Sequence, residues 1–316
     1  MLFEPKAPLF RDPIYDGAAD PTIIWNREEK TWWILYTNRR ASAVSHGVSY
    51  VHGTKIGIAS SADGGRSWLY RGTLDLEFER GTNTFWAPEV IWAKGQYHMY
   101  VSYVQGIPQD WNCGRKILHY TSNNLWDWRF EGALPLSSDR VIDACVFEVR
   151  PGEYKMWYKD EDHHSYSYAA VSHDLYHWEV LGPEVTDRDH EGPNVFRFEG
   201  SFWMVTDPWH GLGVYRSDDA EHWEPQENIL REPGTRTDDG TIGAHADVLV
   251  HEGHAYIFYF THPEVSEEQR THEGFVREYR HRRSSIQVAE LKVENGRMVC
   301  DRNHVQFSLD WEHQPE

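Results

Sequence analysis

Acidic or histidine side chains recur at the start of five apolar stretches of this 316-residue sequence. Successive members are separated by 48 to 69 residues, close to the length of one four-stranded blade of a β-propeller. If each stretch opens the innermost strand of a blade, the five polar side chains converge on one central pocket. Carboxylates gathered in this way can transfer protons to and from a bound molecule, or they can hold an ion. The five residues are Asp20, Glu89, Asp143, Glu191 and His245.

Short strands must position these residues, because period-two alternation recurs along the chain and no long helical pattern appears. The turn dipeptide Asn295-Gly296 joins the last expected pair of strands. Beyond the five strand starts, the alternation predicts strands at residues 30–37, 55–60, 96–103, 116–121, 154–159, 167–172, 201–206, 213–217, 254–261, 285–293 and 297–300.

A second repeat lies between these strands. Each of its four copies begins with Ser, carries Asp or Asn nearby, and reaches a Trp six or seven residues later. Asp and Asn bond their own backbone in tight turns, and Trp then anchors an outer strand. With the five strand starts, the four hairpins predict an all-β fold: one five-bladed β-propeller over residues 1–316, with four antiparallel strands per blade. The copies begin at Ser61, Ser122, Ser172 and Ser217.

Long irregular segments are expected to build a binding site, because loops of this length in a compact fold are usually functional. The last of them is highly charged, which fits either a mobile flap or a solvated loop. The segments are residues 39–54, 104–115, 186–190, 231–243 and 263–283.

Composition narrows the class of partner. The net charge of −19 makes nucleic acid and anionic membranes poor partners, and no run of 18 apolar residues predicts a membrane span. The 15 Trp residues serve core strands in part and also suit stacking on sugar rings, which supports an oligosaccharide or glycoside ligand. The three Cys residues lack metal-ligand spacing and are expected to be reduced thiols. Residues 1–10 lack a signal-peptide pattern, so the expected location is cytoplasmic, or periplasmic or secreted if a signal was removed.

Five short motifs resemble those of the five-bladed propeller glycosidases of glycoside hydrolase family 43 and its relatives in families 32, 68, 117 and 130. The resemblance covers nearly the whole chain in layout. It implies that Asp20 is the general base, that Glu191 is the general acid and that Asp143 tunes this acid. It also implies inversion at the anomeric carbon and places His245 near the axis, beside an ion or water. The motifs are Asp20-Pro21 followed by Trp32-Trp33, Trp86-Ala87-Pro88-Glu89, Ile142-Asp143, Glu191-Gly192-Pro193 and Gly243-Ala244-His245.

The chemistry supports these roles independently. Glycoside cleavage needs a protonated carboxylic acid at the leaving oxygen and an ionised carboxylate on the opposite face of the sugar. A third carboxylate beside the acid raises its pKa by charge repulsion. These roles predict a glycosidase. The long loops favour exo action, and the resemblance implies an inverting enzyme that cleaves a terminal furanosyl or xylosyl residue. No cofactor is expected for the chemistry, while a structural calcium or another ion near the axis would use His245 as a ligand.

Further residues are candidates for substrate binding, each with a structural alternative. Glu89 either contacts substrate or makes a structural hydrogen bond, and His245 either contacts substrate or is a satisfied core histidine. Trp86 is either a wall of the pocket or a core residue, and Trp209, which follows the second strand of blade four, is a candidate for stacking on sugar. Arg39 enters a long loop, where it either binds a substrate hydroxyl or carboxylate or lies solvated at the surface.

Three rival functions stay open. A non-catalytic propeller could use the same carboxylates to bind a sugar or an ion. A phosphorolytic or transferring enzyme would need a basic anion pocket near Asp20, built from Arg39, Arg40 or Arg282. A protein-binding scaffold would not need an acid at every inner strand. Sugar identity, linkage and oligomeric state are not encoded in these patterns.

Overall fold

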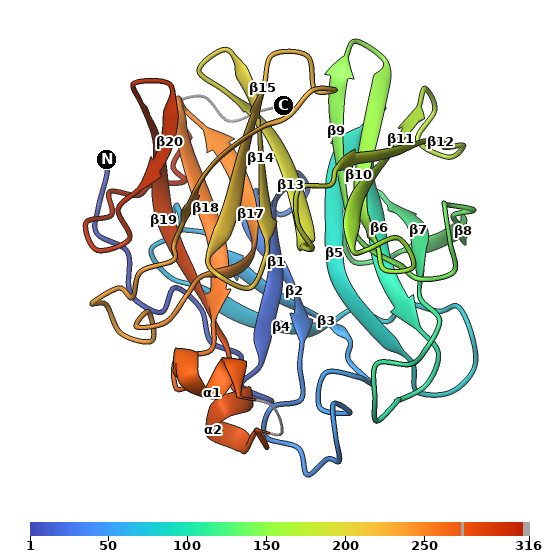
Figure 1. Ribbon diagram of the computed structural model, residues 1–316, viewed down its shortest axis with the longest axis horizontal. Coiled ribbons are helices and arrows are strands. Elements are labelled where there is room, and N and C mark those ends of the chain that lie inside the picture. The colour runs from blue at the N-terminus through green and yellow to red at the C-terminus, as the bar shows by residue number, and fades with distance from the viewer. Residues whose placement is uncertain (273–274, 312–316) are drawn as a thin grey trace.

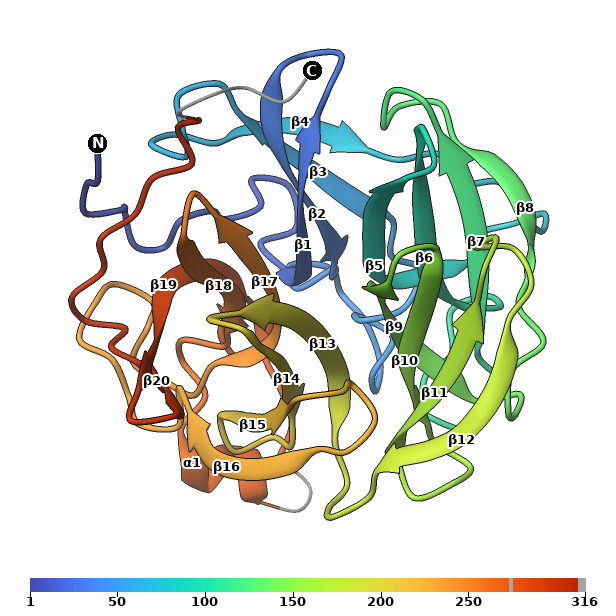
Figure 2. The ribbon, with the colours of Figure 1, turned by 90° about the horizontal axis from the view of Figure 1, so that it is seen from above.

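Five four-stranded antiparallel sheets are arranged around one axis in the computed structural model, which describes residues 1–272 and 275–311 (Figure 1). Within each sheet the strands follow one another in chain order. Seen from above, the first strand of every sheet lies nearest the centre and the fourth lies at the rim (Figure 2). The predicted all-β, five-bladed propeller is confirmed.

The strand bounds show how regularly the chain is divided. Blade one holds β1 (Ala18–Asn26), β2 (Thr31–Asn38), β3 (Ile56–Ser61) and β4 (Leu69–Thr73). Blade two holds β5 (Thr84–Ala93), β6 (Gln96–Val104), β7 (Lys116–Ser122) and β8 (Arg129–Ala133). Blade three holds β9 (Val141–Arg150), β10 (Glu153–Asp160), β11 (Tyr166–Ser172) and β12 (Glu179–Val185). Blade four holds β13 (Glu191–Phe198), β14 (Ser201–Asp207), β15 (Leu212–Ser217) and β16 (Glu224–Ile229), and blade five holds β17 (Ala244–His251), β18 (His254–Thr261), β19 (Ser285–Glu294) and β20 (Arg297–Cys300).

The predicted strands agree with the observed ones to within one residue at each end. The repeated Ser motif forms the predicted turn between the third and fourth strands of blades one to four. In the second blade, for example, Ser122 Oγ accepts the backbone N–H of Leu125, and the indole of Trp128 donates to the Leu125 carbonyl. The same side-chain hydrogen bond recurs in blades three and four.

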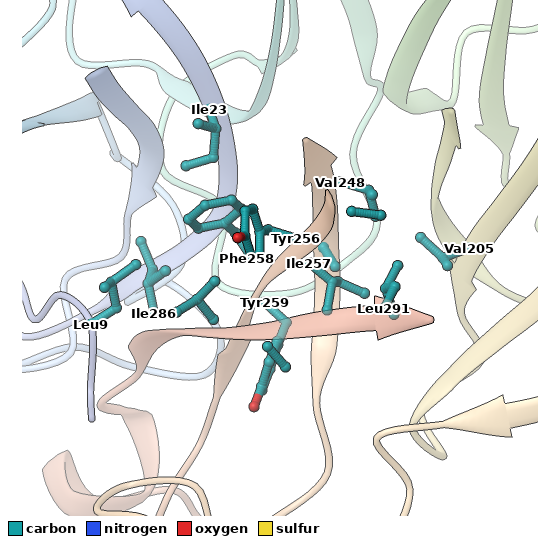
Figure 3. Packing of buried hydrophobic residues seen from close by; sticks show 14 of the residues in the cluster. Leu9, Ile23, Val205, Val248, Tyr256, Ile257, Phe258, Tyr259, Ile286 and Leu291 are labelled. Carbon is teal, nitrogen blue, oxygen red and sulfur yellow. The ribbon is translucent and has the colours of Figure 1, made fainter. Parts of the chain in front are cut away.

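The ring is held closed by apolar packing between its first and last blades. Ile23 of β1 belongs to the same buried cluster as Phe258 of β18 and Ile286 of β19 (Figure 3). The N-terminal segment joins this cluster, because Phe10 pairs with Ile286 and Phe3 pairs with Phe307 in antiparallel bridges. Burying aromatic and branched side chains between blades contributes roughly 1.5–3 kcal/mol each.

The charged segment at residues 263–283 contains two short helices, which the sequence analysis did not predict. They are α1 (Glu267–Thr271) and α2 (Tyr279–Arg282), and they lie at one end of the ring beside the loop that follows β2 (Figure 1). Each is about one turn long, too short to leave a periodic pattern. Ser266 caps α1 by accepting the N–H of Gln269, whose side chain accepts the N–H of Ser266.

Among the described residues, no helix combines the length and the hydropathy that crossing a membrane requires.

Candidate active site

A cavity of about 1100 Å³ opens at the axis, at the end of the ring where the inner strands of the blades begin. Its walls come from all five blades and from four of the five long segments, the lining residues including none of 186–190. Of the residues that the sequence singled out, the cavity is lined by Asp20, Arg39, Trp86, Asp143, Glu191, Trp209 and His245.

Bulges near the start of the inner strands aim the polar side chains at the axis. In β1 the register of pairing with the second strand shifts between Ala19 and Thr22. The same shift occurs at the matching place in the other four blades. Asp20 and Asp143 occupy these bulges with φ of 49° and 59°, in the left-handed region that non-glycine residues seldom adopt. Such bulges commonly re-aim a side chain beside a functional site.

The fourth blade needs glycine at its bulge. Gly192 has φ of 58°, and a Cβ atom placed on it would lie 2.7 Å from Cδ2 of His245. Its backbone N–H donates to Oδ2 of Asp143 at 3.1 Å. The glycine therefore lets the chain pass close to the imidazole while it joins the strand that carries Glu191 to the carboxylate of the third blade.

Asp20 lies between two cations. Arg39 Nη2 is 3.0 Å from Oδ1 and 3.2 Å from Oδ2 of Asp20. His245 Nδ1 is 3.6 Å from Asp20 Oδ1 and 3.9 Å from Asp143 Oδ2. Burial lowers the pKa of His245, but Asp143, Asp20 and other nearby carboxylates outweigh it and raise the pKa above its usual value. The imidazole therefore favours its charged form and links the two carboxylates.

Lys159 of β10, which the sequence analysis read as an ordinary strand residue, contacts the candidate acid. Its Nζ lies 3.1 Å from Glu191 Oε2 and 3.2 Å from Glu161 Oε1. Burial raises the pKa of Glu191, but Lys159, His245 and Arg39 together bring it below its usual value. This differs from the expectation that a neighbouring carboxylate raises the pKa of the acid. Instead, the raised value belongs to Asp143, whose pKa reaches about 6 through burial and the charge of Glu191, against the opposing effect of His245.

Asp207, the last residue of β14, is a further member of the site that sequence reasoning passed over. Its carboxylate accepts the backbone N–H of His245 at 2.9 Å and the backbone N–H of Trp209 at 2.7 Å. Burial and the charge of Glu191 raise its pKa to about 7. Asp207 therefore joins the start of blade five to the backbone of the segment that carries Trp209. The dipeptide Asp207-Pro208 ahead of an aromatic residue was the available signal.

Glu89 lies outside this cavity, and the structure supports the structural alternative given for it. The bulge of the second blade falls at Ala87, with φ of 43°, so Ala87 occupies the place that Asp20 takes in blade one. Glu89 comes two residues further along, where its Oε1 accepts the N–H of Val146 in the neighbouring blade at 2.8 Å. Burial and the nearby Asp247 raise its pKa to about 8.

Equivalent residues of the other blades complete a ring around the axis. Each of three more polar side chains accepts a backbone N–H from the next blade: Cys145 from Val195, Asn194 from Val248, and Asp247 from Ile23. This polar ring therefore ties the blades together beyond the floor of the cavity. One oxygen each of Glu89, Asn194 and Asp247 accepts a backbone N–H, and a structural calcium near the axis stays a prediction.

A metal ligated by His245 stays a prediction. The imidazole is held between two carboxylates and favours its protonated form, which competes with binding of a cation. In the described part of the chain, the compact group with metal-ligand spacing is instead Asp219, Glu221 and His222, all exposed. These residues form the Ser217 turn, where Asp219 accepts the N–H groups of the other two.

Aromatic rings form the side walls of the cavity. Trp209 is 40% exposed, and the Lys159 ammonium lies 5.3 Å from the centre of its ring. Trp111, which is 52% exposed, faces Trp86 with ring centres 6.4 Å apart. The Trp86 indole donates to the Val51 carbonyl, so this ring is fixed while the other two stay open to a ligand.

Comparison with known proteins places the fold. No protein-family model matches the sequence, and no significant relative is found among curated proteins. Solved structures of similar fold include a thermostable family-43 glycoside hydrolase, with 19% identity, a TM-score of 0.68, and coverage of 95% of this chain and 99% of that one. A GH43 β-1,3-galactosidase with galactodeoxynojirimycin has 14% identity, a TM-score of 0.64, and coverage of 92% and 95%. A GH43 β-xylosidase/α-arabinofuranosidase from a compost microbial metagenome, with xylotriose and in a calcium-free form, has 15% identity, a TM-score of 0.63, and coverage of 92% and 94%.

The chain thus has the five-bladed propeller fold of the GH43 enzymes, and the resemblance that its short motifs indicated is confirmed at the level of the fold.

Proposed function

We propose that the protein is a glycoside hydrolase, and that Asp20 and Glu191 are its general base and general acid. The observation that carries the proposal is that Asp20, Asp143 and Glu191 come from three different blades and line one cavity at the axis. Structural neighbours of the same fold are named as xylosidases, galactosidases and arabinanases, which supports a carbohydrate substrate.

In this mechanism Asp20 removes a proton from the attacking water. Arg39 and His245 orient this carboxylate, since both contact its oxygens. Attack by water on the face opposite to the leaving group inverts the anomeric carbon. Asp143 is a positioning residue, because it fixes the Gly192 N–H and so the strand from which Glu191 projects.

Glu191 has to be protonated before it can donate to the leaving oxygen. Lys159 divides its contacts between Glu191 and Glu161, and Arg115 and Arg140 also reach Glu161. We propose that substrate binding moves Lys159 fully onto Glu161. This removes the largest of the effects that lower the pKa of Glu191, while those of His245 and Arg39 remain, so the raising effect of burial weighs more and the protonated acid is favoured.

The long segments that close one side of the cavity favour exo action on a terminal residue. A terminal furanosyl or xylosyl group fits the neighbours that are named as arabinanase and xylosidases.

A screen of aryl glycosides, furanosides included, tests the proposal, with proton NMR to follow the anomer released first. We expect release of the inverted anomer by at least one glycoside class. We also expect Asp20→Asn and Glu191→Gln to lose roughly 100-fold or more in kcat/KM while they still bind the sugar. Wild-type sugar binding without turnover of any glycoside would favour a carbohydrate-binding propeller instead.

A further inference from the structure

The cavity is rich in cations although the chain as a whole is strongly acidic. The net charge of the sequence is −19, yet six arginines and one lysine line the cavity against five aspartates and glutamates. Catalysis on a neutral sugar requires the carboxylates but gives no reason for such a surplus of guanidinium groups. A concave site with an excess of one sign of charge favours ligands of the opposite sign.

Three of these arginines surround one buried tyrosine. The guanidinium of Arg282 lies 4.9 Å from the centre of the Tyr50 ring, and Arg277 Nη1 lies 3.5 Å from the Tyr50 hydroxyl. Arg39, which also contacts Asp20, is close enough for Tyr50 to affect its pKa. The side chains come from the loop after β2 and from the segment around α2, which lie side by side in Figure 1.

Two of these guanidinium groups lack the partner that the other cations of the cavity have. Arg39, Arg115, Arg140, Lys159 and Arg270 each form an ion pair with a carboxylate. Across residues 1–272 and 275–311, the ion pairs include none for Arg277 or Arg282. Arg282 instead donates to Ser45 Oγ at 2.9 Å, and its Nε is buried without a hydrogen-bond partner in the same part of the chain.

We propose that Arg277 and Arg282, with Tyr50 beside them, form a subsite for an anionic substituent of the sugar, a carboxylate or a sulfate ester. This inference rests on the proposed function, because it names the substrate class of the same cavity. Guanidinium groups bind planar carboxylates and sulfate oxygens through paired N–H donors, and such charge-assisted bonds are about twice as strong as neutral ones. Arg39 connects the subsite to Asp20, so the charged sugar would lie next to the bond that is cleaved.

Binding of monosaccharides to the full-length protein tests the subsite without relying on turnover. The probes are D-galacturonate, D-glucuronate and galactose 6-sulfate, with D-galactose, D-glucose and D-xylose as neutral counterparts and inorganic phosphate as a free anion. We expect at least one charged sugar to bind about tenfold more tightly than its neutral counterpart. This preference should shrink as the salt concentration rises from about 50 to about 500 mM. If the uronates bind more tightly than their neutral counterparts, the substituent is a carboxylate; if galactose 6-sulfate does, it is a sulfate ester.

Variants separate this subsite from the general charge of the protein. In Arg277→Gln/Arg282→Gln, and to a smaller extent in Arg277→Gln alone, the ratio of neutral to charged dissociation constants should fall toward one. Arg297→Gln serves as the matched control, because Arg297 is 70% exposed on the outer strand β20. It should retain the wild-type ratio. Thermal melts establish that each variant is folded.

Three results would overturn the subsite. These are equal binding of charged and neutral sugars, a preference that survives the double substitution, and inorganic phosphate that binds more tightly than every charged sugar. Failure of the proposed function is distinguishable, because it would appear as absence of hydrolysis in the glycoside screen while the charged-sugar preference persists.

Discussion

Lys159 Nζ lies 3.1 Å from Oε2 of Glu191, so the candidate general acid is paired with a buried ammonium group. The same ammonium is 3.2 Å from Glu161 Oε1, so Lys159 has a second carboxylate with which it can form an ion pair. A contact of this kind lowers the pKa of a carboxyl group and opposes the acid role. Control of the proton on Glu191 by Lys159 is therefore the feature that most distinguishes this cavity from a simple trio of carboxylates.

Replacement of this lysine should move the pH profile of catalysis. In Lys159→Met the pKa of Glu191 rises, because the nearest cation is gone. The acid then stays protonated to higher pH, and the alkaline limb of kcat/KM should move upward by about one pH unit or more. Lys155→Met is the matched control: this lysine is equally buried on β10 but pairs with Glu184, outside the cavity. If the alkaline limb of Lys159→Met stays where it is in wild type, Lys159 does not control the protonation of Glu191.

Glycine at position 192 should be required for both stability and activity. Gly192→Ala places a Cβ atom 2.7 Å from the His245 ring at φ of 58°, so it adds a clash to backbone strain. Gly200→Ala provides the control, because Gly200 has φ of 86° and nothing within 4 Å of its added Cβ. Chemical denaturation should show a loss of roughly 1 kcal/mol for Gly200→Ala and a larger loss for Gly192→Ala. Glycosidase activity should fall in Gly192→Ala alone. Equal losses in the two variants would contradict the close approach to His245.

The carboxyl of Glu89 should affect stability rather than substrate binding. Its pKa in the folded protein is about 8, raised by burial and by Asp247, whereas an unfolded glutamate titrates near about 4.3. A raised folded pKa gives a stabilising contribution that is complete at low pH and is lost as the pH rises toward about 8. Glu89→Gln removes this titration, so its stability should decline less than that of wild type between about pH 5 and about pH 8.

Denaturant unfolding at the two pH values measures this difference for Glu89→Gln. Glu148→Gln, at an exposed position of β9, should keep the wild-type decline. Substrate KM should stay within a few-fold of wild type in Glu89→Gln. If Glu89→Gln instead shows a large rise in KM and the wild-type pH dependence of stability, Glu89 binds substrate and its structural role is contradicted.

Much of the fold could be predicted because alternation of apolar residues marks buried strands. The second and third strands of the blades lie between neighbouring sheets, so strands such as Gln96–Val104 are apolar along most of their length. The outermost strands were placed by their turns alone, since a strand such as Arg129–Ala133 is mostly exposed and carries no apolar pattern. The helices α1 and α2 were not predicted for a related reason, because each is only about one turn long and so shows no periodic pattern.

The site was predicted where side-chain type and strand start coincide, as at Asp20, Asp143 and Glu191. Glu89 was misplaced because the register of the bulge is a backbone property. A proline follows each of Asp20, Ala87 and Gly192, the residues at the bulges of blades one, two and four. Aligning the inner strands of these blades on that proline would have matched Ala87, and not Glu89, with Asp20. Lys159 could not be assigned from sequence, because its importance depends on a carboxylate 32 residues away in the next blade.

The central claim is that Glu191 is the proton donor. It is tested most directly by how the loss of kcat/KM in Glu191→Gln depends on the leaving group. The measurement is kcat/KM for a pair of aryl glycosides of the same sugar, one with a phenol leaving group and one with a dinitrophenol. A dinitrophenolate departs without protonation, so loss of the general acid should matter little for it. Glu191→Gln should lose roughly 100-fold or more on the phenyl glycoside and less than about tenfold on the dinitrophenyl glycoside, while Asp20→Asn should lose activity on both. Equal losses by Glu191→Gln on the two substrates would contradict its role as the proton donor.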